Sequence, residues 1–333
     1  RADGGRKIFW GHSHGRYRGL ARGHEPQKAN HSQPETLTER KPLMTRIITS
    51  LSEISESYDA LFCDLWGCVH DGLAPFAEAV AALQAFRAGG GTVMLVTNAP
   101  RPHAPVRRQL DRLGVPSDAY DGIATSGDSA RAAMLRGAVG EKVYFIGQPH
   151  DQDFFAPLEL IENPVTISQV PLEQAEGMVC CGPFDPLADP KEMRAQFLQA
   201  KTRGLKLLCA NPDIVVDRGE TREWCAGALA KLYTEMGGES LYFGKPHPPI
   251  YDLARRRLQA LGKDIPDSRI LCVGDGILTD IDGAMGEDLD SLFITGGLAA
   301  RETQTADQPD PKALMAYLTK EMRQPAYSIG KLR

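Results

Sequence analysis

Polar side chains with matching chemistry occur along the chain, each just after an apolar segment or at the start of a helix. In order they are Asp64, Thr97, Lys245, Asp275 and Asp280. Two carboxylates at neighbouring strand ends form a hard oxygen site that suits Mg²⁺, and a hydroxyl at a helix start can hold phosphate oxygens. A lysine can neutralise a phosphate, and a carboxylate that faces a metal can attack phosphorus. The set therefore favours phosphoryl chemistry.

Each of these residues also has a simpler interpretation. An aspartate after a strand is more often a satisfied turn residue, and Thr97-Asn98 is typical of a turn. A lysine such as Lys245 is usually a solvated surface charge. The segment Gly274–Asp280 has some features of a calcium loop, but it lacks the third oxygen ligand and the distal glutamate. The specific signal is the order of the residue types, each after its own strand.

Apolar segments bounded by turn residues must position these side chains. The strand predicted at 60–65 is apolar up to Asp64 and delivers it to the carboxyl edge of a parallel sheet, where ligands bind in open α/β folds. Strands alternate with amphipathic helices, which predicts a doubly wound α/β fold. The predicted strands are 60–65, 92–97, 122–126, 143–147, 178–182, 205–210, 241–244, 269–274 and 291–296. The predicted helices begin near 76, 102, 127, 190, 223, 245 and 311.

Composition restricts the class of protein. The chain has 333 residues, of which 42% are hydrophobic and 24% charged, and its net charge is −5. No apolar run approaches the ~20 residues that span a bilayer. We therefore expect one large or two medium domains, no nucleic-acid partner and no membrane association. The seven cysteines include no CxxC pair, and several lie in apolar runs, so we expect reduced core cysteines and a cytoplasmic location.

Residues 1–43 differ in composition from the rest of the chain. They contain Gly, Arg, His, Gln and Pro with little apolar periodicity, so we expect residues 1–47 to form a disordered extension without a catalytic role. Met44 would be a plausible native start. An organellar targeting arm is a second interpretation, which the acidic residues in this segment weaken.

Together these segments resemble the haloacid dehalogenase-like (HAD) superfamily of hydrolases, which use an aspartate nucleophile. In detail they resemble its subfamily IIA, which includes p-nitrophenylphosphatase-like, pyridoxal-phosphate phosphatase-like and ribonucleotide-monophosphatase-like enzymes. The resemblance covers residues from about 58 to 300. The matching segments are Asp64–Gly67, Leu95–Asn98, Ala210–Asp213, Gly244–Pro246 and Gly274–Asp280.

The resemblance implies a two-domain architecture. A Rossmannoid, doubly wound core would comprise residues 48–139 and 223–333, and an inserted α/β cap domain would comprise residues 140–222. In this subfamily the cap closes the active site and shapes substrate choice, and members often form homodimers through it. We therefore expect a small phosphorylated metabolite as the substrate and allow for a homodimer.

The resemblance also implies a role for each residue of the core site. Asp64 would attack phosphorus to form an aspartyl-phosphate, and it would bind Mg²⁺ together with Asp275 and the backbone carbonyl of Trp66. Asp280 would bind metal-bound water or orient Lys245, and Lys245 would offset the charge of the phosphoryl group. These roles amount to positioning and electrostatic stabilisation, which phosphoryl transfer chiefly requires.

Substrate binding would involve both domains. Thr97 and Asn98 would hold the phosphate, while Asn211 and Asp213 would belong to the cap loop nearest the catalytic groups. An equally weighted interpretation is that the turn at Asn211-Pro212-Asp213 only ends a strand.

Trp66 departs from the family pattern. Phosphatases of this family carry a second aspartate two residues after the nucleophile, which protonates the leaving group and later activates water. An indole can do neither, although such catalysis is worth about 10²–10⁴-fold. His70 or Asp71 could take over proton transfer, although a histidine at such a position is somewhat more often a simple surface loop residue. The substrate could instead have a good leaving group, or a different bond such as a phosphonate or carbon–halogen bond.

A third explanation is that the protein binds a phosphorylated ligand without hydrolysing it and acts as a sensor or binding module. The intact set of Asp64, Lys245, Asp275 and Asp280 favours catalysis, because a binding protein would not need the nucleophile. The sequence therefore predicts a slow or specialised Mg²⁺-dependent hydrolase of a small phosphorylated metabolite.

Overall fold

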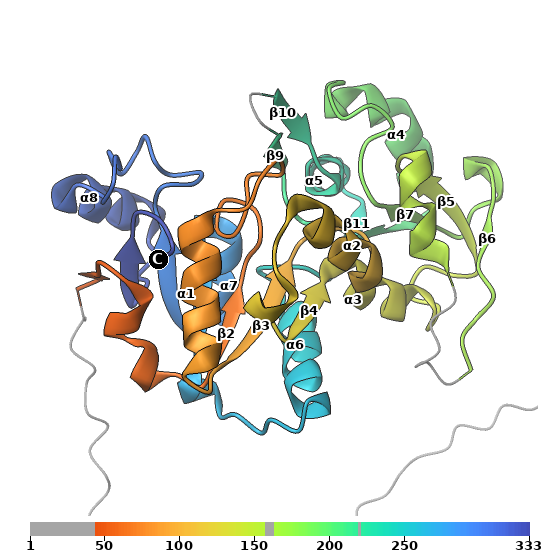
Figure 1. Ribbon diagram of the computed structural model, residues 1–333. Coiled ribbons are helices and arrows are strands. Elements are labelled where there is room, and N and C mark those ends of the chain that lie inside the picture. Colours follow the sequence, from red (N-terminus) through yellow and green to blue (C-terminus); the bar gives the residue numbers. More distant parts are fainter. Residues whose placement is uncertain (1–43, 157–162, 219–220) are drawn as a thin grey trace, which may run out of the picture. The chain divides into compact units, whose positions relative to one another are not determined.

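The first sheet consists of apolar strands with helices on both faces (Figure 1). In β2 (Ala60–Cys63), Leu61 and Cys63 pack in one apolar cluster with α1 (Ala77–Ala88). Ala60 and Phe62 pack in another cluster with α6 (Pro248–Ala260). Because successive side chains of a strand point to opposite faces, a strand that is apolar throughout needs a helix on each side. The computed structural model describes residues 44–156, 163–218 and 221–333.

The remaining strands and α-helices of the described residues have the following bounds. The other strands are β1 (Arg46–Ile47), β3 (Thr92–Thr97), β4 (Gly122–Thr125), β5 (Lys142–Ile146), β6 (Ser168–Gln169), β7 (Gly177–Cys180), β8 (Lys206–Cys209), β9 (Val215–Arg218), β10 (Thr221–Trp224), β11 (Glu239–Tyr242), β12 (Ile270–Gly274), β13 (Asp290–Ile294) and β14 (Tyr327–Ile329). The other α-helices are α2 (His103–Leu113), α3 (Ser126–Met134), α4 (Arg194–Thr202), α5 (Ala226–Glu235), α7 (Asp282–Gly286) and α8 (Pro311–Glu321), and a π-helical turn, η8 (Ile277–Ile281), precedes α7.

The first sheet has the strand order β1-β14-β13-β12-β2-β3-β4, and all of its ladders are parallel. The predicted doubly wound α/β fold is therefore confirmed. Asp64 directly follows β2, Thr97 ends β3 and Asp275 directly follows β12. Since β12 and β3 are the two neighbours of β2, the sheet brings the carboxyl ends that carry these three residues together.

A second parallel sheet, with the order β11-β8-β7-β5-β6, is formed entirely by strands that lie between β4 and β12 in the sequence. It is therefore inserted into the first fold. Phe197 and Tyr233 pack against each other in its apolar core, with ring centroids 5.2 Å apart. β11 belongs to this sheet and lies beyond residue 222, where the sequence prediction ends the cap. Its pairing with β8 is a long-range contact, which local pattern cannot reveal.

Two short regions differ from the predicted elements. The helix predicted from 223 begins at Ala226, because Thr221–Trp224 pair with Val215–Arg218 as an antiparallel hairpin, β9–β10. β14, a strand that was not predicted, pairs in parallel with β13 and with β1. Arg46 and Ile47, the last two residues of the predicted extension, thus lie in the sheet, while the prediction for residues 1–43 lies outside the described residues.

The cysteines and the helices can be compared with what the composition predicts. All seven cysteines are free and buried, which confirms that they are core residues. Within the described ranges, the helices are too short or too polar to cross a bilayer.

Leu61 offers a direct test of the core of the first sheet. It is fully buried, so Leu61→Ala should lower the free energy of unfolding by about 2–5 kcal/mol. Leu73 is 68% exposed, and Leu73→Ala should stay within about 0.5 kcal/mol of wild type. Urea unfolding of both variants measures the difference, and equal midpoints would contradict the described packing.

Candidate active site

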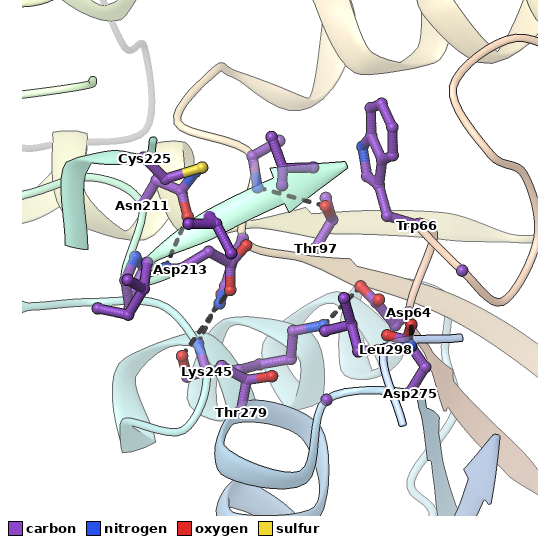
Figure 2. Close-up of a pocket in the computed structure, with 18 of the residues that line it drawn as sticks. Asp64, Trp66, Thr97, Asn211, Asp213, Cys225, Lys245, Asp275, Thr279 and Leu298 are labelled. Carbon is purple, nitrogen blue, oxygen red and sulfur yellow. Dashed lines mark hydrogen bonds and ion pairs between the residues drawn. The ribbon is translucent and has the colours of Figure 1, made fainter. Parts of the chain in front are cut away.

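A buried lysine between two carboxylates forms the centre of the site (Figure 2). The Nζ of Lys245 lies 2.5 Å from Oδ1 of Asp64 and 2.7 Å from Oδ1 of Asp280. Asp64 comes from the end of β2, Lys245 from the loop before α6 and Asp280 from η8. The sequence-predicted lysine is therefore brought into direct contact with the predicted nucleophile.

Burial and pairing oppose each other in these three groups. Burial lowers the pKa of Lys245, but Asp280 and Asp64 outweigh it and raise that pKa well above its ordinary value. Lys245 is consequently an ammonium ion at neutral pH. Burial raises the pKa of Asp64 although Lys245 works against this, and burial likewise raises the pKa of Asp280 to about 6.

Asp275 lies in a cradle that has no room for larger residues. A Cβ placed on Gly67 would lie 2.2 Å from Oδ2 of Asp275, and a Cβ on Gly297 would lie 2.0 Å from the same oxygen. The N–H of Leu298 donates to that oxygen at 3.1 Å. Gly67 also has a φ of +73°, which favours glycine. Two glycines thus let the backbone close around one carboxylate and fix its direction.

The geometry of these carboxylates suits a divalent cation. The ligand atoms of Asp64, Cys68 and Asp275 all lie within 4.8 Å of one another, and all three residues are buried. Burial, followed by the charge of Asp64, raises the pKa of Asp275 well above its ordinary value. A cation would relieve this repulsion, and the carboxylate oxygens are ligands that Mg²⁺ accepts. The residues therefore fit Mg²⁺.

Asp280 and Cys68 lie near the proposed cation position, but neither is a clear ligand for Mg²⁺. Oδ2 of Asp280 accepts the N–H of Gly276 at 3.1 Å while Oδ1 binds Lys245, so Asp280 is not part of the cluster described above. Cys68 was missed by sequence reasoning, although its place four residues after Asp64 is a spacing that could have indicated it. A thiol is not a ligand that Mg²⁺ prefers.

Asn98 connects the two sheets at the site. Its Oδ1 accepts the backbone N–H of Lys245 at 2.7 Å, and its Nδ2 donates to the carbonyl of Lys245 at 3.0 Å. The same Nδ2 donates to Oδ1 of Asp213 at 2.8 Å. Asn211 accepts the N–H of Asp213 with its Oδ1 at 3.0 Å. The structure therefore brings both predicted cap residues to the core site.

Thr97 lies at the end of β3 and is buried at the edge of the same cavity. Its Oγ1 accepts the N–H of Ala99 at 3.3 Å. A hydroxyl that accepts one hydrogen bond still has its own proton to donate. Thr97 therefore keeps a proton that it can donate to an anion in the cavity.

Trp66 is held firmly and its indole points away from Asp64 (Figure 2). The ring of His70 packs edge-on against the indole, with centroids 5.1 Å apart. A Cβ on Gly72, whose φ is +86°, would lie 2.2 Å from the indole ring. The loop from 66 to 72 is thus built around this side chain.

The two residues predicted as substitute proton carriers differ in their access to the site. Nδ1 of His70 accepts the N–H of Gly72 at 3.0 Å, and burial lowers the pKa of His70 to about 4. Asp71 borders the cavity, whereas His70 is not among the described residues that line it. Oδ1 of Asp71 accepts the N–H groups of Leu73 and Ala74, both at 2.8 Å.

A cavity of about 980 Å³ surrounds these groups, which is large enough for a metabolite. The first sheet and its loops contribute Asp64, Thr97, Lys245 and Asp275 to its wall. The inserted segment contributes residues of the hairpin β9–β10 and of the loop before it. The apolar residues of the wall are Trp66, Phe76, Ile214, Trp224, Leu278 and Leu298, among others. The wall of the cavity thus combines charged and polar groups with apolar side chains.

Comparison with known proteins places this arrangement in a family. Residues 61–160 match a family model described as haloacid dehalogenase-like hydrolase, and residues 242–320 match a second model of HAD-like hydrolases. A solved structure of a haloacid dehalogenase-like hydrolase from Brucella suis is 39% identical, with a TM-score of 0.75. It covers 86% of this chain, and all of that chain is matched.

More distant relatives have named activities. The 5'-nucleotidase YutF of Bacillus subtilis is 24% identical over 266 residues, which are 79% of this chain and 97% of that protein. The glycerol phosphate phosphatase of Mycobacterium tuberculosis, solved in complex with magnesium, is 24% identical with a TM-score of 0.59. The match covers 86% of this chain and 78% of that one. With the Brucella protein matched over its whole length, this chain belongs to the haloacid dehalogenase-like hydrolase family.

Proposed function

We propose that this protein is a Mg²⁺-dependent phosphatase of a small phosphorylated metabolite and that it works through an aspartyl-phosphate on Asp64. The observation that carries the proposal is the ammonium of Lys245, 2.5 Å from Asp64 in a cavity that Asp275 also lines. A metal bound by Asp64 and Asp275 would supply positive charge to the phosphoryl oxygens. The phosphatase and nucleotidase activities named for the relatives support this choice of substrate class.

The chain's own residues account for the remaining requirements of phosphoryl transfer. Oδ1 of Asp64 is paired with Lys245, which fixes the direction of the carboxylate, so that one of its oxygens can attack phosphorus while the other would bind the metal. The hydroxyl of Thr97 and the backbone N–H of Asn98 would hold the phosphoryl oxygens. Lys245 would balance the charge that accumulates as phosphorus passes between oxygens.

The inserted sheet would act as the cap that the family resemblance implies. We place the predicted cap, residues 140–222, together with α5 and β11, because α5 packs in the apolar core of the inserted sheet and β11 completes that sheet. The hairpin β9–β10 and the loop before it contribute Ile214, Val215 and Trp224 to the cavity wall. These apolar side chains would contact the part of the substrate beyond the phosphate and thereby influence which metabolite is accepted.

A phosphate-release screen over metabolite phosphates tests this function. With Mg²⁺ present, wild type should release phosphate from at least one ester, and chelation by EDTA should stop the reaction. Asp64→Asn should lower kcat on the order of 10⁴–10⁶-fold, since it removes the nucleophile. Retained affinity for a phosphorylated ligand without any turnover by wild type would instead favour the non-hydrolytic binding protein.

The cradle around Asp275 gives a test of the metal site that does not depend on turnover. Gly297→Ala would push a Cβ against Oδ2 of Asp275 and should weaken Mg²⁺ binding by about 10–100-fold, as loss of a supporting contact typically does. Gly286→Ala is the matched control, because nothing lies within 4 Å of a Cβ there. Calorimetric titration with Mg²⁺ measures both variants. Equal affinities in the two would refute the assignment of Asp275 as a ligand.

A further inference from the structure

The loop that carries Asp213 is fixed against the helix that follows it. The N–H of Gly227, in the first turn of α5, donates to the carbonyl of Asp213 at 3.1 Å. A Cβ on Gly227 would lie 2.0 Å from the carbonyl oxygen of Pro212. Together with the hydrogen bond from Asp213 to Asn211, these contacts determine where the carboxyl group of Asp213 points.

The carboxyl group of Asp213 has one fixed oxygen and one that remains available. Oδ1 accepts a hydrogen bond from the side-chain amide of Asn98. The same side chain binds both the backbone N–H and the backbone carbonyl of Lys245. Across the described ranges, no hydrogen bond to Oδ2 of Asp213 is found, and the residue lines the same cavity as Asp64 and Lys245. The side chain therefore lies beside the residue that would hold the phosphoryl group and can offer an oxygen to it. Figure 2 shows this carboxyl group and the indole of Trp66 on different sides of the cavity.

The surroundings of Asp213 favour its protonated form. Burial raises its pKa, with a further contribution from Asp280, while the hydrogen bond from Asn98 and the charge of Lys245 work against the rise. Asp64, Cys209 and Cys225 are the other titratable groups that interact with it. A carboxyl group in such a place keeps its proton to higher pH than an exposed aspartate, as a general acid near neutral pH requires.

The neighbouring candidates are less suited to donate a proton. The indole of Trp66 is a hydrogen-bond donor only. Hydrogen bonds from Ala74 and Leu73 lower the pKa of Asp71, so it is ionised at neutral pH. His70 is neutral at that pH, with Nδ1 already bound to Gly72. Among the residues considered for this task, Asp213 alone is both at the cavity wall and protonated more readily than usual.

We propose that Asp213, in the loop after β8, is the general acid and base of this enzyme, in place of the aspartate whose position Trp66 occupies. The inference rests on the proposed phosphatase function. In the first step a bond forms between Asp64 and phosphorus, the bond from phosphorus to the leaving oxygen breaks, and that oxygen takes the proton of Asp213. In the second step water bonds to phosphorus and gives a proton to the Asp213 carboxylate as the bond to Asp64 breaks. Phosphate leaves, and both aspartates return to their initial states.

Leaving-group dependence tests this role. The probes are p-nitrophenyl phosphate, phenyl phosphate and the alkyl phosphate that wild type hydrolyses best, each with Mg²⁺. Asp213→Asn should lower kcat/KM by about 10²–10⁴-fold for the alkyl ester, whose leaving oxygen needs a proton, and by less than about tenfold for the nitrophenyl ester. Because kcat/KM reports only the steps up to leaving-group release, a slow second step does not affect it. A uniform loss for all three esters would overturn the proposal, because a residue that only positions the cap or Asn98 would act equally on each.

Two further variants sharpen the result. Adding Trp66→Asp to Asp213→Asn should restore hydrolysis of the alkyl ester at least tenfold, since it returns a carboxyl group to the usual position. Asp71→Asn removes the carboxylate that the loop after Asp64 contributes to the cavity wall. If Asp71→Asn rather than Asp213→Asn produces the leaving-group dependence, the proposal is wrong.

Wild type provides a test that does not require a folded variant. Its kcat/KM for the alkyl ester should fall as pH rises through the pKa of Asp213, whereas kcat/KM for the nitrophenyl ester should lack that decrease. Identical pH profiles for the two esters would overturn the role of Asp213 while leaving the phosphatase function intact. Failure of wild type to hydrolyse any ester would instead refute the function itself.

Discussion

The buried ammonium of Lys245 constrains the whole site, because it must stay within reach of two carboxylates that come from separate segments. Its Nζ joins Asp64 after β2 to Asp280 in η8. Removing one partner would leave an uncompensated charge in the interior, which typically costs about 3–5 kcal/mol. The backbone at the end of β12 leaves room for Asp280 to reach Lys245. A Cβ on Gly274 would lie 2.0 Å from Cγ of Asp280, so β12 has to end in glycine for Asp280 to reach the lysine.

The same constraint links the inserted sheet to the core. The side chain of Asn98 binds the backbone N–H and carbonyl of Lys245 and also donates a hydrogen bond to the carboxyl group of Asp213. A shift of the loop that carries Asp213 would therefore alter the position of Lys245 and, through it, that of Asp64. This arrangement offers a physical reason why a carboxyl group from the inserted segment could replace one from the first sheet. The proton donor does not need to follow the nucleophile in sequence, provided that this loop presents it to the leaving group.

Much of the fold was predictable because its signals are local. The apolar runs before Asp64 and Asp275 indicate buried parallel strands, and their carboxyl ends indicate where a ligand would bind. The antiparallel hairpin β9–β10, the short strand β14 and the membership of β11 in the second sheet were not predictable, because each depends on pairing with residues distant in sequence or on a hairpin without a clear alternation.

The candidate site was predictable by residue type but not by partner. Sequence order named Asp64, Lys245 and Asp280, yet only the structure gives the contact of the lysine with both carboxylates. The glycine cradle of Asp275 was missed, since it depends on loops that meet in space, whereas Cys68 was missed although its spacing from Asp64 is local. The role of Asn98 as the link between Lys245 and Asp213 likewise has no signal in a single sequence.

The central claim is that Asp64 forms a covalent bond to phosphorus during turnover. Rapid acid quenching of the Mg²⁺-loaded enzyme during hydrolysis, followed by peptide mass spectrometry, tests it most directly. A phosphoryl group should appear on the peptide that contains Asp64, and it should be removable by hydroxylamine and absent from Asp64→Asn. Phosphate release without a phosphoryl group on Asp64, or with one on another residue, would contradict it.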